Sequence, residues 1–220
     1  MLFDLDFSAR VGSREVACIA QSDDRVLAIT GPSGIGKTSV LNAIAGLITP
    51  ECGHIAVRAT RLFDHARGID LPVQKRRAGY VFQDNRLFAH RRVGANLGFA
   101  ERLAGTPLIA REEIVDVLGI GHLMRRWPAS LSGGEAKRVA IGRALLSAPR
   151  FLLLDEPLAS VDPARRDDIL ALIERIRDDF AMPIVYVSHD AAEVARLTDA
   201  VVSLGDELQL ARGVGAQRDV

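Results

Sequence analysis

The chain has 220 residues, which suffices for one domain with a full core, or for one domain with a small insert, but not for two large independent domains. Its 28 Lys and Arg balance its 28 Asp and Glu, so nothing in the charge points to nucleic acid, and we expect no nucleic-acid partner. Two cysteines without metal-ligand spacing, no basic start followed by an apolar core at the N-terminus, and no run of about 20 apolar residues together predict a cytoplasmic protein.

The first third of the chain reads as strands around one helix. Apolar runs predict strands over residues 2–7, 15–20, 25–30, 54–59 and 78–83. Between the third and fourth, a helix from Lys37 to Gly46 carries its apolar residues on one face.

The rest of the chain alternates helices with strands. Residues 84–149 have helical periodicity, with helices predicted over 93–103, 111–124 and 134–146. Strands follow at 150–157, 183–190 and 199–205, separated by helices over 163–180 and 190–197. Such alternation is typical of a parallel sheet covered by helices on both faces, and the central helical stretch is interpreted as an insert.

A glycine-rich segment, "GPSGIGKT", joins the third predicted strand to its helix. It satisfies the pattern G-x-x-x-x-G-K-S/T, in which backbone N–H groups surround a β-phosphate, a lysine bridges the β- and γ-phosphates and a hydroxyl binds Mg²⁺. Bound ATP and Mg²⁺ are therefore predicted. The contacts expected for the nucleotide come from Gly31, Pro32, Ser33, Gly34, Ile35, Gly36, Lys37 and Thr38, with Thr38 also a metal ligand.

The apolar strand in "FLLLDEP" delivers two carboxylates to its C-terminal end, where open α/β sheets bind ligands. Asp155 is interpreted as a Mg²⁺ ligand and Glu156 as a group facing an attacking water. Because adjacent side chains of a strand point to opposite faces, one carboxylate can serve the metal and the other the nucleophile.

The segment "LSGGE", Leu131 to Glu135, opens another amphipathic helix and resembles a second phosphate seat, but it contains no lysine. Unpaired N–H groups and the positive end of the helix dipole favour an anion there. The residues themselves do not say whose phosphate this seat would hold.

Taken together, these motifs resemble those of the ATP-binding subunits of ABC transporters, over essentially the whole chain and in the family's order. "GPSGIGKT" resembles Walker A, "FLLLDE" Walker B, "VFQD" the Q-loop, "LSGGE" the signature, "ASVD" the D-loop and "VSHD" the switch-histidine segment. The resemblance implies an α/β fold: a P-loop NTPase (RecA-like) core with a mixed sheet, about residues 1–85 and 150–220, and an inserted α-helical signature subdomain, about 86–149.

The resemblance also assigns roles and a partner. Two copies of the chain would bind head to tail, and the signature loop of one copy would close over the ATP that the other copy holds. It implies that Gln83 contacts Mg²⁺ or the attacking water, that Glu156 is the general base, and that His189 holds the γ-phosphate. The nucleotide contacts supplied to the other copy would be Ser132, Gly133 and Gly134, with Asp162 linking the two sites.

Within the family, residues 61–99 are similar to the ATPase subunits of molybdate importers. This resemblance implies transmembrane permease subunits as partners, indirectly a substrate-binding protein, and a peripheral place on the inner face of the membrane. Molybdate subunits usually continue into a C-terminal anion-binding regulatory domain, whereas this chain stops at Val220, so either the variant lacks that domain or the chain is cut.

Other features of the sequence predict surface, groove and adenine contacts. The basic runs 74–77 and 90–92 are expected to be solvated faces. A second group of side chains either lines the permease groove or packs in the core: Leu87, Phe88, Val93, Leu97 and Phe99. No aromatic residue lies between Phe7 and Phe63 to stack on adenine, so an apolar residue such as Val11 is expected to contact it.

Two other functions compete with a transport ATPase. A small-molecule kinase also uses Walker A, but it needs an acceptor pocket and no second phosphate seat. A soluble ABC ATPase of translation or DNA repair usually carries two cassettes or long coiled-coil inserts, for which 220 residues leave no room.

Overall fold

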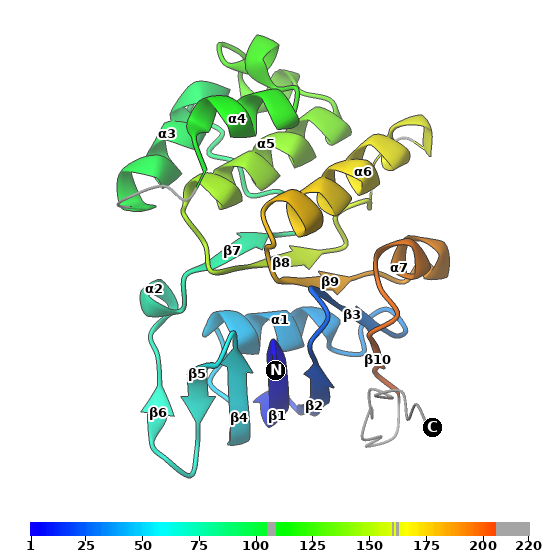
Figure 1. Cartoon of the computed structure of the whole chain (residues 1–220). Coiled ribbons are helices and arrows are strands. Elements are labelled where there is room, and N and C mark those ends of the chain that lie inside the picture. Colours follow the sequence, from blue (N-terminus) through cyan, green and yellow to red (C-terminus); the bar gives the residue numbers. More distant parts are fainter. Residues whose placement is uncertain (105–108, 160, 162, 206–220) are drawn as a thin grey trace. The chain divides into compact units, whose positions relative to one another are not determined.

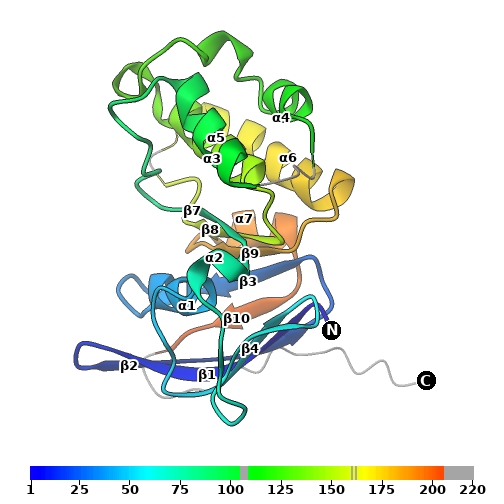
Figure 2. The same ribbon diagram turned by 90° about the vertical axis from the view of Figure 1, so that its left-hand side faces the viewer.

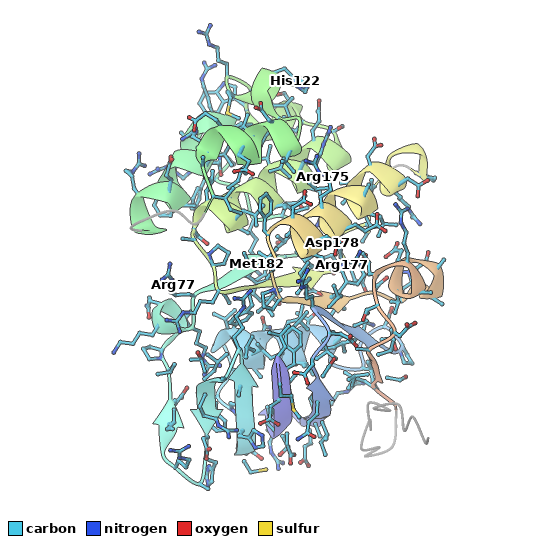
Figure 3. The ribbon with its side chains drawn as sticks, in the orientation of Figure 1. Arg77, His122, Arg175, Arg177, Asp178 and Met182 are labelled. Carbon is cyan, nitrogen blue, oxygen red and sulfur yellow. The ribbon has the colours of Figure 1, made fainter. Side chains whose placement is uncertain are left out.

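The structure is a computed structural model that describes residues 1–104, 109–159, 161 and 163–205. Asp162 therefore lies outside the described residues. The chain divides into two compact units: residues 1–76 with the segment from Pro183 onward form unit 1, and Arg77–Met182 form unit 2. Figure 3 labels Arg77 and Met182, the first and last residues of unit 2. Each unit is described by itself, and the boundaries predicted for the core and the helical subdomain stay predictions.

Unit 1 contains an antiparallel sheet in the order β2-β1-β4-β5-β6 (Figures 1 and 2). Along β1 every second side chain is buried, from Phe3 to Ala9, which matches the alternation in the sequence. The strands are β1 (Phe3–Val11), β2 (Arg14–Ser22), β4 (Cys52–Val57), β5 (Thr60–Asp64) and β6 (Ile69–Asp70).

The parallel pairing predicted from the alternation of helices and strands does not extend to this sheet, whereas the family resemblance implied a mixed sheet. Its neighbouring strands all pair antiparallel, and β5 and β6 were not predicted at all. The strand expected over residues 54–59 ends at Val57, because Arg58 and Ala59 turn the chain with φ values of 50° and 59°.

The parallel strands of unit 1 carry the ends on which the candidate site depends. β10 (Val201–Ser203), β3 (Val26–Thr30) and β9 (Ile184–Val187) pair parallel in that order, and the described side chains of β9 are all buried. Helix α1 (Lys37–Ala45) lies between these strands and the antiparallel sheet (Figures 1 and 2), and α7 (Ala191–Leu197) follows β9.

The short helix α2 (Val73–Arg76) corrects the interpretation of residues 74–77 as a solvated face at one position, because Gln74, Lys75 and Arg77 are exposed but Arg76 is not. Arg76 is fully buried and donates hydrogen bonds to the carbonyls of Ala43 and Ile44 in the last turn of α1, at 2.7 and 3.0 Å. It also binds the carbonyl of Leu71 and pairs with Asp70 at 2.8 Å. Only the fold brings these acceptors together, so the basic run in the sequence did not indicate that Arg76 is buried.

Unit 2 consists of two parallel strands and several helices. β7 (Ala78–Val81) pairs with β8 (Phe151–Asp155), and the helices gather around α5, which contacts β7 and the other long helices of the unit (Figure 1). The helical elements are α3 (Val93–Ala104), α4 (Arg111–Val117), η1 (Gly121–Leu123), η2 (Pro128–Ser130), α5 (Gly133–Leu146) and α6 (Pro163–Asp179).

The helix predicted over 111–124 is shorter than expected. α4 ends at Val117, and Gly119 follows with a φ of 59°, a left-handed conformation that stops the helix before η1. Val93 and Leu97, left open between groove and core, are fully buried, while Phe88 and Phe99 are half-buried and their rings meet edge to face at 4.9 Å.

Among the described residues, no helix is both long and apolar enough to cross a membrane.

Candidate nucleotide site

The glycine loop of unit 1 runs from the end of β3 to the first turn of α1. Gly31, Gly34 and Gly36 have φ values of 142°, 79° and 116°, which side-chain-bearing residues rarely adopt. A Cβ on Gly36 would lie 2.7 Å from Val16 Cγ2, and one on Gly31 would lie 2.6 Å from the carbonyl oxygen of Leu204. The loop conformation therefore needs glycine for both its dihedral angles and its close contacts.

Lys37 is buried, with 5% of its surface exposed, although it opens α1. Its ammonium donates hydrogen bonds to the carbonyls of Gly31 and Pro32, at 2.8 and 2.9 Å. These bonds hold the amine across the loop, beside the backbone N–H groups at the start of a helix, where an anion is favoured. Thr38, the next residue, is exposed.

His189 follows β9, the strand that pairs with β3. The register joins Ile29 to Val187, so the next positions of the two strands lead into Gly31 and His189 at neighbouring ends. Because parallel strands present their carboxyl ends at one edge, the fold brings the exposed His189 to the same edge as the glycine loop.

A buried carboxylate fixes the turn that carries His189. Glu193 accepts hydrogen bonds from the hydroxyls of Tyr186 and Ser188, at 2.9 and 2.7 Å. Ser188 Oγ accepts the backbone N–H of Asp190, and Asp190 caps α7 by accepting the N–H groups of Ala192 and Glu193. The segment around the histidine is therefore held on both sides.

In unit 2, β8 ends with the two carboxylates singled out in the sequence. Asp155 is 3% exposed, whereas Glu156 is half-buried. The strand stops at Asp155 and Glu156 has a φ of 43°, so the turn, not strand alternation, sets the direction of the Glu156 side chain. A left-handed non-glycine residue costs free energy, on the order of 1–3 kcal/mol, and such strain gathers at functional sites.

The segment of residues 82–86, called the Q-loop here, follows β7. It carries the exposed Gln83, and two of its residues, Asn85 and Arg86, have positive φ values of 59° and 46°. Since Val81 pairs with Leu154, continuing the parallel register leads Phe82 to Asp155, so Gln83 and the two carboxylates stand at neighbouring strand ends.

Two basic side chains of α5 bind the backbone of the Q-loop. The ammonium of Lys137 donates to the carbonyls of Phe82 and Gln83, both at 3.3 Å. The guanidinium of Arg143 donates to the carbonyls of Arg86 and Asn85, at 2.6 and 3.1 Å.

Lys137 is 1% exposed, so its charge is held inside the protein. Burial lowers the pKa of Lys137 to about 8, although the carboxylates of Asp155 and Asp84 act in the opposite direction.

The signature segment forms the N-terminus of α5, as predicted. Ser132 is the cap residue: its hydroxyl accepts the N–H of Glu135, and the Glu135 carboxylate accepts the N–H of Ser132 at 2.7 Å. Ser132 and Gly133 are exposed and Gly134 is buried.

Glu135 does more than complete the cap. Its carboxylate pairs with Arg126 at 3.1 Å and lies 4.0 Å from Nε2 of His122, which Figure 3 labels near the end of the helical part. The backbone N–H of Ser132 and, to a smaller extent, Arg126 and His122 lower the pKa of Glu135, so the group stays anionic.

Comparison with known proteins identifies the family of the chain. The family described as "ABC transporter" matches residues 19–159, more than half of the chain. The chain belongs to the ABC transporter family.

Relatives within the ABC transporter family include three proteins named "Molybdenum import ATP-binding protein ModC". The chain is 56% identical to that of Brucella melitensis biotype 1 over 193 residues, 87% of this chain and 54% of the relative. It is 50% identical to that of Mesorhizobium japonicum, covering 95% and 57%, and 46% identical to that of Rhodospirillum rubrum, covering 96% and 58%. The chain thus spans a little over half the length of these relatives.

Solved structures of ABC cassettes have the same fold. A dimeric structure of a bacterial ABC transporter cassette matches with a TM-score of 0.71 and 24% identity, covering 92% of this chain and 93% of that one. A dimeric post-hydrolysis state with ADP and phosphate matches with a TM-score of 0.74 and 24% identity, covering 93% and 94%. The predicted α/β fold of a P-loop NTPase is confirmed.

The ABC cassette thus gathers its predicted site residues in two groups. Unit 1 brings together the glycine loop and His189, and unit 2 brings together Gln83, Asp155 and Glu156, with the signature loop at the head of α5. Among the described residues no group of three or more His, Cys, Asp or Glu side chains could hold a metal ion.

Sequence reasoning missed Lys137 and Arg143 as residues that contact the Q-loop. A signal was present for Lys137, which stands three, four and seven positions before Ala140, Ile141 and Ala144 on the apolar face of its helix. A lysine in line with core residues indicates a buried cation that needs acceptors.

Proposed function

We propose that this chain binds and hydrolyses ATP and thereby powers a membrane importer of molybdate or a related oxyanion. The observation that carries the proposal is the pair of phosphate seats on two helices: the glycine loop with Lys37 before α1, and the lysine-free, capped N-terminus of α5. A kinase would need only the first seat, whereas two copies arranged head to tail would use both.

The roles proposed for the residues follow from their surroundings and the family resemblance. The loop from Gly31 to Thr38 would hold the phosphates, and His189 would contact the γ-phosphate. Glu156 would accept the proton of the attacking water, which typically contributes about 10²–10⁴ in rate. Gln83 would orient that water or bind the metal.

The donors assigned to Mg²⁺ are the hydroxyl of Thr38, the carboxylate of Asp155 and the amide oxygen of Gln83. They fit the ion, because Mg²⁺ prefers hard oxygen donors and takes few of them from the protein, the rest coming from phosphates and water. Asp155 suits this role in particular, since a buried carboxylate gains most from a cation. Bound there, the ion would neutralise charge on the β- and γ-phosphates.

The proposed partners are a second copy of the chain, transmembrane permease subunits and, through them, a substrate-binding protein. In the head-to-tail dimer, Ser132, Gly133 and Gly134 would contact the ATP of the other copy and Asp162 would link the sites. The names of the relatives, which import molybdenum, support the substrate, and a peripheral place on the inner membrane face follows from the permease. Core and helical subdomain would span about residues 1–85 with 150–220, and 86–149.

Two variants test the ATPase proposal. Lys37→Ala should abolish tight ATP binding, because it removes the cation facing the β- and γ-phosphates. Glu156→Gln should keep binding but nearly stop turnover, and it should accumulate an ATP-bound dimer visible by light scattering. Unchanged ATP affinity in the first variant, or wild-type turnover in the second, would contradict the assignment.

A mixed dimer tests whether the signature loop serves the other copy. Lys37→Ala and Ser132→Arg each break both composite sites of a homodimer, but a mixed dimer keeps one site with both residues intact. Nucleotide trapping with vanadate should therefore return when differently tagged variants are mixed and the mixed dimer is isolated. If each signature loop served its own chain, every chain would carry a broken site and no trapping would appear.

The transported anion is tested by reconstitution. Purified chain, candidate permease and binding protein should hydrolyse ATP faster with molybdate than with sulfate at equal concentration. Stimulation by sulfate alone would reject molybdate while leaving the ATPase assignment intact.

A further inference from the structure

The contacts of Lys137 and Arg143 with the Q-loop are not explained by nucleotide binding or by the core. Together the two side chains donate hydrogen bonds to four backbone carbonyls of the Q-loop, those of Phe82, Gln83, Asn85 and Arg86, all within unit 2. Both donors stand on α5, the helix that the signature loop opens. One helix therefore carries a phosphate seat at its first residue and holds the Q-loop along its side.

The burial of Lys137 makes its two hydrogen bonds important. A buried ammonium is costly unless it donates hydrogen bonds, and in the described part of the chain Lys137 donates to two Q-loop carbonyls. The arrangement thus holds the loop, because moving Phe82 or Gln83 away would take a hydrogen-bond acceptor from the buried ammonium.

The backbone of the Q-loop is strained and depends on contacts with its surroundings. Asn85 and Arg86 both have left-handed backbone conformations, which cost free energy and persist only where surrounding contacts impose them. The turn closes with hydrogen bonds from Asn85 N–H to the Phe82 carbonyl at 3.0 Å and from Arg86 N–H to the Asp84 carbonyl at 2.7 Å. Lys137 shares the Phe82 carbonyl with that turn, so its loss should loosen the turn directly.

We propose that Lys137, supported by Arg143, is a positioning residue that holds the Q-loop against α5, so that Gln83 and the signature loop move as one body. Lys137 stands five residues after Ser132, about 7.5 Å along a continuous helix, a distance over which a helix is stiff. A displacement of the Q-loop then shifts the signature loop with it. The consequence for catalysis rests on the proposed ATPase function, whereas the mechanical contact does not.

Amide hydrogen exchange tests the contact without any activity. In Lys137→Met, which keeps length and removes the donors, the amides of Asn85 and Arg86 should exchange about tenfold faster or more, while those of β8 and α6 keep their wild-type rates. Lys137→Gln keeps an N–H donor and should restore much of the protection.

A matched control on the same helix is Arg138→Met, because Arg138 donates to the Leu118 carbonyl at 3.5 Å and not to the Q-loop. It should leave Q-loop exchange unchanged.

Wild-type Q-loop exchange in both the Met and Gln variants of Lys137, or equal acceleration in β8 and α6, would overturn the proposal. If the Met variant does not fold, Arg143→Gln takes its place: it should exchange faster in the Q-loop than Lys137→Gln, and equal exchange in these two variants would overturn the proposal.

Steady-state kinetics test the catalytic consequence. Lys137→Met should lower kcat about tenfold with KM for ATP within about twofold of wild type, because the glycine loop of unit 1 is untouched. Lys75→Met, at an exposed lysine of α2, should keep wild-type kinetics. A raised KM with unchanged kcat would overturn the positioning role, whereas a wild-type chain without ATPase activity would reject the proposed function and leave the exchange result standing.

Discussion

Replacing the buried arginine of α2 should cost much of the protein's stability. In Arg76→Met, the carbonyls of Ala43, Ile44 and Leu71 lose a charged donor and Asp70 loses its ion-pair partner. The side chain of Asp70 is 47% exposed and regains water, but a buried carbonyl without its donor typically costs about 1–3 kcal/mol, so the three carbonyls together should cost about 3–5 kcal/mol. That is a large part of the roughly 5–15 kcal/mol by which a domain is stable.

Urea unfolding followed by circular dichroism measures this loss. With a slope of about 2 kcal/mol per molar urea, the midpoint of Arg76→Met should fall by about 1.5–2.5 M. The control is Arg10→Met, whose ion pair with Glu51 at 3.0 Å is more than half exposed on the arginine side, and its midpoint should not change. Asp70→Asn should lie between the two, because it removes only the charge of the partner.

The reasoning would be refuted if Arg76→Met unfolded within about 0.5 M of wild type. In that case the guanidinium would fill space against Gly46, 2.7 Å from the position of an added Cβ, without contributing through its hydrogen bonds.

Three further predictions use other features of the described chain. Gly36→Ala should lower both stability and ATP affinity, since its Cβ would lie 2.7 Å from Val16 and its φ is 116°; adding Val16→Ala should recover only the steric part, measured by thermal unfolding and ATP titration. In the native protein a thiol reagent should modify the exposed Cys52 but not Cys18, whose pKa burial raises to about 12, and both should react in urea; rapid native modification of Cys18 would be inconsistent with its burial. The pKa of Glu135 is held below its ordinary value of 4.5, so the ionised carboxylate stabilises the fold above that value and this contribution is lost as pH falls through the lower folded pKa. The urea midpoint of wild type should therefore exceed that of Glu135→Gln at pH 7, and the difference between the two midpoints should close in acid. A difference that stays constant with pH would contradict this role of Glu135.

Local patterns in the sequence determined the parts of the site that depend on neighbouring residues. The glycine loop was predictable because positive φ values, a following helix and the spacing to Lys37 are all encoded within eight residues, Gly31 to Thr38. The cap of α5 was equally local, since Ser132 and Glu135 satisfy each other's backbone N–H groups at a spacing of three. Apolar alternation likewise marked β1 as a strand, and a continuous apolar run marked β3.

The tertiary structure alone decided what depends on distant partners. β5 forms because β4 offers it an edge, and β6 forms because β5 does, and antiparallel pairing is invisible in a short polar segment such as Ile69–Asp70. The direction of Glu156 came from a turn and not from strand alternation. Arg76 was expected on a solvated face and Lys137 was given no role, and the backbone carbonyls that surround them lie up to 33 and 55 positions away in the sequence. The sequence around a charged residue does not show which acceptors it will have when buried, because those acceptors are supplied by residues far along the chain.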